Sequence, residues 1–368
     1  IRRSGESGIL DTEIGFLAND TDERTQFDVK QHKPSGHSAT LLEHCLRSIA
    51  VVSVFGEHGL PLMRGGDWND GFNRVGSEGK GESVWLGFFL FSVLEAFAGI
   101  LSARGDRDRA RIYHERSVTL KNALNTDGWG GHWFLRAFYD DGTPLGAESS
   151  RECRIDAIAQ AWSVLSGAGD PEKSRKALEN LLHFLYDPES KILKLLDPPF
   201  NDLSKKNPGY IKDYPPGIRE NGSQYNHAVF WAAEAFAKLG HANSALSLLE
   251  CANPIRRSDS EDAARLYEAE PYVIAAEVYS AEHCGKGGWT WYTASAGLFY
   301  RTIIETLFGI RLEGGFVSVC PAFPKQWLNA SITLPQPSGR FTFAFTAREG
   351  HSNSVRSITQ DGALLDRF

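Results

Sequence analysis

The chain has 368 residues and a mass of 40.7 kDa, and its hydrophobic fraction of 42% excludes a disordered polypeptide. Its formal net charge is −7, and no run of Lys and Arg exceeds two residues, which argues against nucleic acid or an anionic membrane as a partner. We therefore expect a small or neutral ligand.

Apolar residues recur with helical spacing through most of the first 308 residues, a pattern typical of a mainly α protein. Between the third and fourth predicted helices, residues 132–146 contain a DG turn between apolar runs, which predicts a short β-hairpin. The predicted helices cover residues 39–54, 82–103, 107–124, 153–166, 171–185, 225–239, 242–251 and 293–308.

The sequence changes character after Gly309. Alternating, β-branched and aromatic runs separated by Pro, Gly and Ser replace the helical spacing, which predicts short strands. We therefore expect a helical body over residues 1–309 and a β-rich C-terminal layer over residues 310–368.

The longest apolar run, residues 84–101, approaches the length of a membrane span. Glu95 interrupts it and no Lys, Arg or aromatic anchors flank it, so we interpret it as a buried core helix. The five cysteines lack CxxC spacing, which favours free thiols in a reducing compartment and predicts a cytoplasmic location.

Four clusters rich in Gly, Trp, Tyr, Asn, His and acidic residues lie at or before helix starts, about 65–85 residues apart. This spacing equals roughly two helices plus loops. If helices alternate between an inner and an outer ring, the starts of the inner helices converge, so we expect the clusters to meet. The clusters are "GGDWNDG" (65–71), "ECRIDAIAQAW" (152–162), "RENGSQYNHA" (219–228) and "GGWTWYTASAG" (287–297).

The first cluster has two ordinary interpretations, a capped turn and a calcium loop. Asp67, Asn69 and Glu78 fall at positions one, three and twelve of a calcium loop, but position six is Phe72, where glycine is required. Position five is Gly71, which has no ligand side chain. Because no HExxH or similar His/Cys set occurs either, we expect no metal.

The four clusters together combine flat apolar rings with acids, amides and a histidine. A pyranose ring has apolar C–H faces and a rim of hydroxyl groups, so this combination favours a carbohydrate site. The rings come from Trp68, Trp162, Trp289, Trp291, Tyr225 and Tyr292.

Cleavage of a glycosidic bond needs an acid that protonates the leaving oxygen, and burial against an indole raises the pKa of a carboxyl group. Asp70, beside Trp68, fits this requirement. A hydrolase needs a second carboxylate, for which Asp156, Glu220 and Asp67 remain open alternatives. If phosphate is the nucleophile, the site instead needs anion donors such as His227, Thr293 and the backbone N–H groups near 293–295.

The same stretches resemble glycoside hydrolase family 94, the inverting glycoside phosphorylases, which include cellobiose phosphorylase. They are most similar to the phosphorylase-like C-terminal region of bacterial cyclic β-1,2-glucan synthases. The resemblance implies an (α/α)6 toroid, here lacking its N-terminal helices, with a small β-rich C-terminal layer. It covers most of residues 40–325, including "LLEHCLRSI", "RGGDWNDGFNRVGSEGKGESVWLGFFL", "YPPGIRENGSQYNHA", "EPYVIAAEVYS" and "GGWTWYTASAG".

The resemblance also implies roles for individual residues. Asp70 would be the general acid, with Trp68 along the sugar at the cleaved bond. Phosphate would bind at His227, Thr293, Ala294 and Ser295, attack the anomeric carbon and yield α-glucose 1-phosphate from a β-glucan, with β-1,2 linkage favoured. Inorganic phosphate would be the co-substrate, with no cofactor. The remaining substrate-binding residues would be Asp67, Arg219, Glu220, Gln160, Trp162 and Trp291.

Two features depart from the family pattern. Ala294 stands where the family has glycine, and the upstream half-barrel with an RDxxQD motif is absent, so "IRRSGESGILDTEIGFL" (1–17) corresponds to a mid-barrel helix and loop. We therefore expect a fragment whose ring is completed by an N-terminal half-barrel or a homodimer mate. In a synthase it would be a soluble region of an inner-membrane protein. The alternatives are an inverting β-glucan hydrolase and a non-catalytic glucan-binding region.

Overall fold

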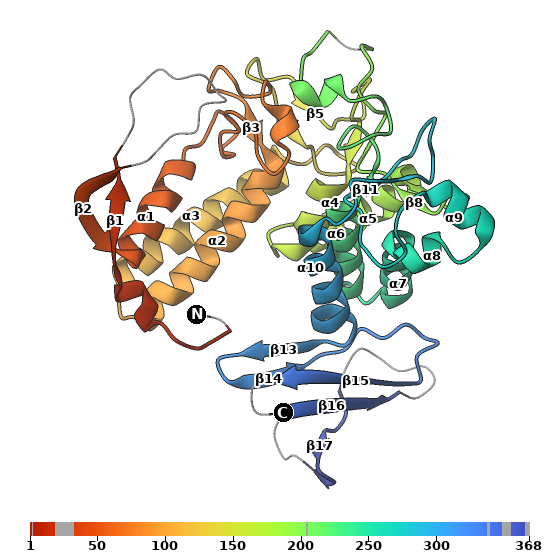
Figure 1. Ribbon diagram of the computed structural model, residues 1–368. Coiled ribbons are helices and arrows are strands. Elements are labelled where there is room, and N and C mark those ends of the chain that lie inside the picture. Colours follow the sequence, from red (N-terminus) through yellow and green to blue (C-terminus); the bar gives the residue numbers. More distant parts are fainter. Residues whose placement is uncertain (2, 19–32, 204, 337–338, 348–354, 365–368) are drawn as a thin grey trace. The chain divides into compact units, whose positions relative to one another are not determined.

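The computed structural model describes residues 1, 3–18, 33–203, 205–336, 339–347 and 355–364 (Figure 1). The chain divides into two compact units. The first contains Ile1–Val54 and Leu312–Val317, and the second contains Phe55–Arg311 and Ser318–Phe368. All candidate site residues belong to the second unit, and the domain boundary expected at residue 309 stays a prediction.

The first unit begins with a 3-10 helix, η1 (Gly8–Asp11), and an antiparallel strand pair. Strand β1 (Glu13–Leu17) pairs with β2 (Pro34–Thr40), so the segment expected to correspond to a helix and loop also contains a strand. Helix α1 (Leu41–Val52) follows directly, and the Thr40 hydroxyl caps it by accepting a hydrogen bond from the Glu43 N–H at 3.3 Å.

The second unit confirms the predicted helices. Helix α4 starts later than expected, because Ile155 and Asp156 pair with residues 196–197 as a strand before the helix begins. Short helices α8 (Pro254–Arg257) and α9 (Glu261–Tyr267) were not predicted. The long helices are α2 (Val84–Ala103), α3 (Arg107–Thr126), α4 (Ala157–Leu165), α5 (Pro171–Leu185), α6 (Asn226–Lys238), α7 (Ala242–Ala252) and α10 (Thr293–Arg301), which continues as the π-helix η4 (Thr302–Leu307).

The long helices pack in two layers (Figure 1). Helices α3, α5 and α7 each pack against the helix that precedes them, while α2 contacts α4, α4 contacts α6, and α6 contacts α10. Among the described helices, α2 alone is long and apolar enough to cross a membrane. Within its most apolar 18-residue stretch, 44% is buried. Its packing against α3 and α4 agrees with the predicted core helix.

Short strands precede helices α2, α4 and α6 and set their starting points. Strand β3 ends where α2 begins, β6 ends where α4 begins, and β10 ends where α6 begins. The resulting small sheets are β3 (Glu82–Ser83), β4 (Ala137–Phe138) and β5 (Pro144–Leu145); β6 (Ile155–Asp156) with β9 (Leu196–Asp197); and β10 (Gln224–Tyr225), β11 (Glu277–Val278) and β12 (Gly287–Gly288). A further hairpin joins β7 (Tyr186–Asp187) to β8 (Ile192–Leu193).

The C-terminal strands confirm the predicted change from helices to strands. The strands at 310–313, 329–336 and 339–346 pack with residues 303–308 and 323–327 in a small core around Phe308, Ile310, Phe323 and Leu334. The paired strands are β13 (Ile310–Glu313) with β14 (Phe316–Val319), β15 (Asn329–Gln336) with β16 (Gly339–Thr346), and β17 (Thr359–Gln360) with β18 (Ala363–Leu364).

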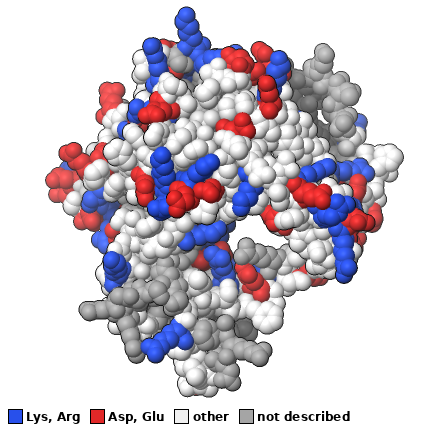
Figure 2. Space-filling view, turned by 180° about the vertical axis from the view of Figure 1, so that it is seen from behind, with Lys and Arg blue, Asp and Glu red and all other residues white. Residues whose placement is uncertain are grey.

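All five cysteines are free thiols, with Cys153 and Cys251 buried and Cys320 exposed. On the face shown in Figure 2, acidic and basic side chains are interspersed. The surface seen there therefore offers mixed charge.

Candidate active site

The turn at residues 65–73 is built by capping and close packing. The Asn69 side chain accepts a hydrogen bond from the Gly71 N–H at 3.0 Å and so caps the short 3-10 helix η2 (Asp70–Phe72). Gly71 is required by close approach, because a Cβ there would lie 2.9 Å from the Ile211 side chain. The phenylalanine of η2 is fully buried in a core that includes residues of the 132–146 hairpin. The turn is therefore firmly anchored.

A buried charge cluster holds Asp67, near the start of this turn. The Arg136 guanidinium binds both oxygens of Asp67, at 2.6 and 2.7 Å, and neither side chain is exposed. The Ser83 hydroxyl donates to the same carboxylate at 2.6 Å. Because its oxygens are engaged by Arg136 and Ser83 and its side chain is buried, Asp67 supports the turn, and its expected contact with substrate stays a prediction.

The third member of this cluster is Asp156, whose Oδ2 lies 3.3 Å from Arg136 Nε. Its Oδ1 caps α4 by accepting hydrogen bonds from the Ile158 and Ala159 N–H groups. Burial raises the pKa of Asp156 to about 6, although the Arg136 charge opposes this shift. Asp156 is therefore a poor candidate for a hydrolytic base, because its carboxylate lies inside the protein.

Asp70 has a different environment from Asp67. It is exposed, so the expected burial of its carboxylate against the indole of Trp68 is not found. Its hydrogen-bond partner is the hydroxyl of Tyr210, whose own pKa is raised by burial and by this carboxylate. Tyr210 begins the 3-10 helix η3 (Tyr210–Asp213), which is tied to the turn by a hydrogen bond from the Tyr210 N–H to Asn73 Oδ1 at 3.1 Å.

Trp68 connects the first cluster to the third. Its ring centroid lies 5.3 Å from that of Tyr225, 5.8 Å from that of His227 and 5.5 Å from that of Trp231, all edge-on. These three partners lie at the start and on the first turns of α6. The predicted convergence of "GGDWNDG" with "RENGSQYNHA" is therefore present.

His227 brings the fourth cluster to the same place. Its ring centroid lies 5.6 Å from that of Tyr292, the residue before α10. Burial lowers the pKa of His227 to about 4, so the ring is neutral near pH 7, and its buried Nδ1 has no hydrogen-bond partner. A neutral ring with a free nitrogen can donate one hydrogen bond to a ligand.

The first turn of α10 offers further donors. The first N–H groups of a helix have no intrahelical acceptor, and α10 has no side-chain cap. Thr293 and Ala294 are exposed, whereas Ser295 is fully buried with its hydroxyl unpartnered. Ala294 has a helical backbone and no positive φ, so its replacement of the family glycine demands no unusual angle.

A second group of charges lies beside this convergence. Arg219 Nε is 3.8 Å from Glu220 Oε2, and its Nη1 is 4.0 Å from Glu277 Oε2. Burial raises the pKa of Glu277 to about 7, and it raises the pKa of Glu220 with a further contribution from the Asp70 charge. The Tyr225 hydroxyl donates to Glu220, which ties this group to the aromatic cluster.

Two other predicted residues have mainly structural surroundings. Gln160 is fully buried, and its amide accepts a hydrogen bond from the Phe134 N–H and donates one to the Phe134 carbonyl, both at 2.9 Å, so it joins α4 to the hairpin. The Trp162 ring packs edge-on against Trp85 and Trp231, with its Nε1 buried and unpartnered. Trp162 therefore extends the aromatic cluster around Trp231, and the expected contacts of both residues with substrate stay predictions.

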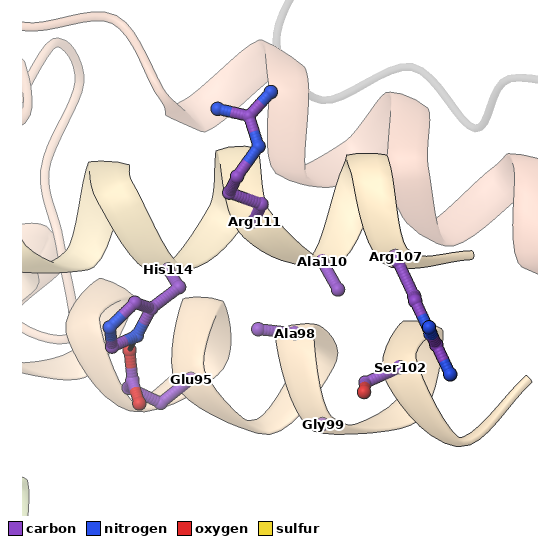
Figure 3. A pocket seen from close by; sticks show the side chains of 8 residues that line it. All are labelled: Glu95, Ala98, Gly99, Ser102, Arg107, Ala110, Arg111 and His114. Atoms are coloured by element: carbon purple, nitrogen blue, oxygen red, sulfur yellow. Dashed lines mark hydrogen bonds and ion pairs between the residues drawn. The ribbon is translucent and has the colours of Figure 1, made fainter. Parts of the chain in front are cut away.

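A groove lies between α2 and α3, and no residue of the four clusters lines it (Figure 3). Its volume is about 430 Å³, and His114 Nδ1 lies 2.9 Å from Glu95 Oε1 along one edge. Its floor consists of small residues, including Ala98 and Gly99. Within the described residues, no group of three or more His, Cys, Asp or Glu side chains could hold a metal ion.

Three residues of this site were missed by the reasoning from sequence, namely Arg136, Tyr210 and Glu277. Arg136 and Glu277 do carry a signal, because each is a single charge inside an apolar run, "FLRAF" and "VIAAEVY", where a charged side chain is usually buried and paired. Tyr210 lies in a Pro- and Gly-rich loop, where nothing local indicates its contact with Asp70.

Comparison with known proteins shows the family. Residues 13–309 match the family described as Glycosyl hydrolase 94 superfamily, catalytic domain. The chain is 41% identical to the cyclic beta-(1,2)-glucan synthase NdvB of Rhizobium meliloti over 98% of its own length and 13% of that protein. It is 27% identical to a solabiose phosphorylase of Paenibacillus borealis over 88% of its length and 42% of that protein.

The chain thus spans less than half the length of these two relatives. A solved structure titled as a sialidase shares the fold over 82% of this chain and 29% of that one, with a TM-score of 0.57 and 13% sequence identity. The helix-rich body, with small sheets at the helix starts, agrees with the family match. The chain belongs to the glycosyl hydrolase 94 superfamily.

Proposed function

We propose that this region carries out inverting phosphorolysis of a β-linked glucan, with β-1,2 linkage favoured, and releases α-glucose 1-phosphate. One observation carries the proposal: Trp68, two residues before Asp70 on the same turn, lies against His227, whose buried Nδ1 is unpartnered and which adjoins the start of α10. The turn that carries the candidate acid therefore meets the candidate phosphate donors at one aromatic surface. The β-1,2 preference is supported by the similarity to a cyclic beta-(1,2)-glucan synthase.

In this mechanism Asp70 donates a proton to the departing sugar oxygen as phosphate attacks the anomeric carbon from the opposite face. His227, the Thr293 hydroxyl and the α10 N–H groups hold the phosphate. Phosphate supplies the nucleophile, so no second carboxylate, cofactor or metal takes part.

We also assign the helices to part of an (α/α)6 toroid in which α2, α4, α6 and α10 are the inner ring. Their contacts in chain order, with α3, α5 and α7 packed against them, support this arrangement. The free cysteines support a cytoplasmic location, since thiols stay reduced there.

The test is release of α-glucose 1-phosphate from β-1,2-glucooligosaccharides, with and without inorganic phosphate. Phosphate-dependent release should fall by about 10²–10⁴-fold in Asp70→Asn, the usual range for loss of a general acid. Asp259→Asn, an exposed aspartate outside the site, is the matched control and should retain full activity. Release that is absent, or unchanged in Asp70→Asn, would contradict the proposal.

A β-glucan hydrolase is the second candidate, because Glu220 lies within electrostatic reach of Asp70 and is the remaining carboxylate of the three alternatives. A hydrolase would release reducing sugar without phosphate, and Glu220→Gln would abolish that release. Oligosaccharide binding without either product would instead indicate a glucan-binding region.

A further inference from the structure

Glu277 is a buried carboxyl group that the proposed mechanism does not use. Only 1% of its surface is exposed, and its Oε2 has no hydrogen-bond partner within the described residues. Burial raises the pKa of Glu277 to about 7, so the surroundings disfavour its charged form and holding that charge costs stability. Because strongly shifted pKa values cluster at functional sites, Glu277 is a candidate for a functional role.

The sheet of β10, β11 and β12 fixes the position of this carboxyl group. Glu277 of β11 pairs with Tyr225 of β10 on one side and with Gly288 of β12 on the other, so the three residues share one face. A Cβ at Gly288 would lie 2.5 Å from Glu277 Oε1, so a glycine is needed there. The second glycine of the "GGWTWYTASAG" cluster therefore leaves room for the glutamate side chain.

The carboxyl group of Glu277 lies beside the guanidinium of Arg219. Glu277 Oε2 is 4.0 Å from Arg219 Nη1, and Glu220 Oε2 is 3.8 Å from Arg219 Nε. Both separations exceed the roughly 2.7–3.2 Å of an N–H···O hydrogen bond. The two carboxyl groups therefore attract the guanidinium by charge without accepting its hydrogen bonds, which leaves its N–H groups able to donate to a ligand.

Aromatic rings hold the same guanidinium from another side. Its carbon lies 4.2 Å from the centroid of the Trp289 ring and 5.7 Å from that of Tyr214. A ring attracts a cation mainly towards its face, so a charge at the side is needed to fix the guanidinium across the rings. Glu220, with 13% of its side chain exposed, can turn towards a ligand. Glu277 is buried, so its carboxylate acts on Arg219 alone.

We propose that Glu277 is a positioning residue whose carboxylate holds the Arg219 guanidinium where it donates hydrogen bonds to hydroxyl groups of the glucan. The inference rests on the proposed function, which supplies the ligand and the contact of Arg219 with it. Because only ionised Glu277 holds the guanidinium, the affinity for glucan should rise as pH rises through the pKa of Glu277, which is about 7.

The other charged and titratable groups that face the Glu277 carboxyl group come from neighbouring elements. Arg219 and Glu220 lie in the loop before β10, Tyr225 lies on β10, and the Tyr279 ring lies beside Gly288. Arginine and tyrosine ordinarily keep their charge state between pH 6 and pH 8. A pH dependence that disappears in a Glu277 variant therefore belongs to Glu277, whatever Glu220 contributes to both proteins.

The test is calorimetric binding of β-1,2-linked glucobiose to the full chain at pH 6 and pH 8, without phosphate. A carboxyl group with a pKa of about 7 is about 9% ionised at pH 6 and about 91% ionised at pH 8, so the apparent affinity should rise by up to about tenfold. In Glu277→Gln this rise should disappear, and the affinity should stay near the wild-type value at pH 6. Glu179→Gln, at an exposed position of α5, is the matched control and should keep the wild-type rise.

Two further measurements separate positioning from a structural role. Because the pKa of Glu277 is raised, its contribution to stability is full below about pH 4.5 and is lost as pH rises through about 7. Glu277→Gln should therefore not lower the melting temperature at pH 8. In an Arg219→Gln background, Glu277→Gln should cause no further loss of affinity at pH 8, because its effect passes through the guanidinium.

Three results would overturn the inference. They are an affinity that does not change between pH 6 and pH 8 or keeps its rise in Glu277→Gln, no binding of glucobiose, and an undiminished effect of Glu277→Gln when Arg219 is replaced. A Glu277-dependent rise in affinity in a chain that carries out no phosphorolysis would refute the proposed function alone.

Discussion

Replacing Arg136 by Met should destabilise the protein strongly, because it leaves two carboxylates buried with no cation. Arg136 and Asp67 have no exposed side-chain surface, and Asp156 Oδ2 is 3.3 Å from the guanidinium. Removing one partner of a buried ion pair costs about 3–5 kcal/mol. At roughly 2–4 °C per kcal/mol for a body of this size, the melting temperature should fall by roughly 6–20 °C.

Asp67→Asn should be much milder than Arg136→Met. The asparagine variant still pairs Arg136 with Asp156, and it removes the Asp67 charge that raises the pKa of Asp156. The buried charge therefore stays balanced in one variant and not in the other. Arg265→Met, at an exposed pair with Glu261, is the control and should change stability by less than about 0.5 kcal/mol.

The pH dependence provides an independent check. Burial raises the pKa of Asp156 above its unfolded value, so its contribution to stability is present below about pH 4 and is lost as pH rises through about 6. Without the guanidinium this effect should grow, so Arg136→Met should be more stable at pH 5 than at pH 8. Thermal unfolding followed by circular dichroism measures both effects. Equal losses for Arg136→Met and Asp67→Asn, or the opposite pH trend, would refute the reasoning.

Three further substitutions probe separate contacts. Tyr210→Phe removes the hydroxyl that donates to Asp70, so kcat for phosphorolysis should fall about tenfold with little change in KM. His227→Gln should raise the KM for phosphate in steady-state assays. Because burial lowers the pKa of His227 to about 4, the wild type should lose up to about 3 kcal/mol of stability as pH falls from 6.5 towards 4. The His227→Gln variant should not show this loss. Glu82→Gln should cost about 2–3 kcal/mol in thermal melts, because buried Glu82 accepts hydrogen bonds from the His58 and Leu60 N–H groups; a smaller loss would show that these bonds are weak.

Local patterns were reliable where one element decides its own structure. The apolar stripes predicted the long helices, and the DG turn predicted the hairpin in which Ala137 pairs with Leu145. Errors arose where a distant segment intervened. Helix α4 starts after Asp156 because that residue pairs with Leu196, and nothing near residue 153 indicates this.

The candidate site shows the same difference between what local sequence predicts and what distant segments decide. Asp67 and Asp70 lie on one short turn and look equivalent in sequence, yet Asp67 is buried on Arg136 while Asp70 is exposed beside Tyr210. Gln160, which was itself expected to line the pocket, uses its amide in hydrogen bonds with the Phe134 backbone. Which side of the turn faces solvent depends on the segments packed against it.

The sequence by itself determined the helical periodicity, the change to strands after Gly309 and the residue types that favour a sugar and phosphate site. These are properties of neighbouring residues, and periodicity or composition reports them directly. Only the tertiary structure decided which polar groups make hydrogen bonds within the protein and which remain available to a ligand. The Arg136–Asp67 pair spans 69 residues of chain, so the residues around Arg136 can indicate a buried, paired charge but not which residue is its partner.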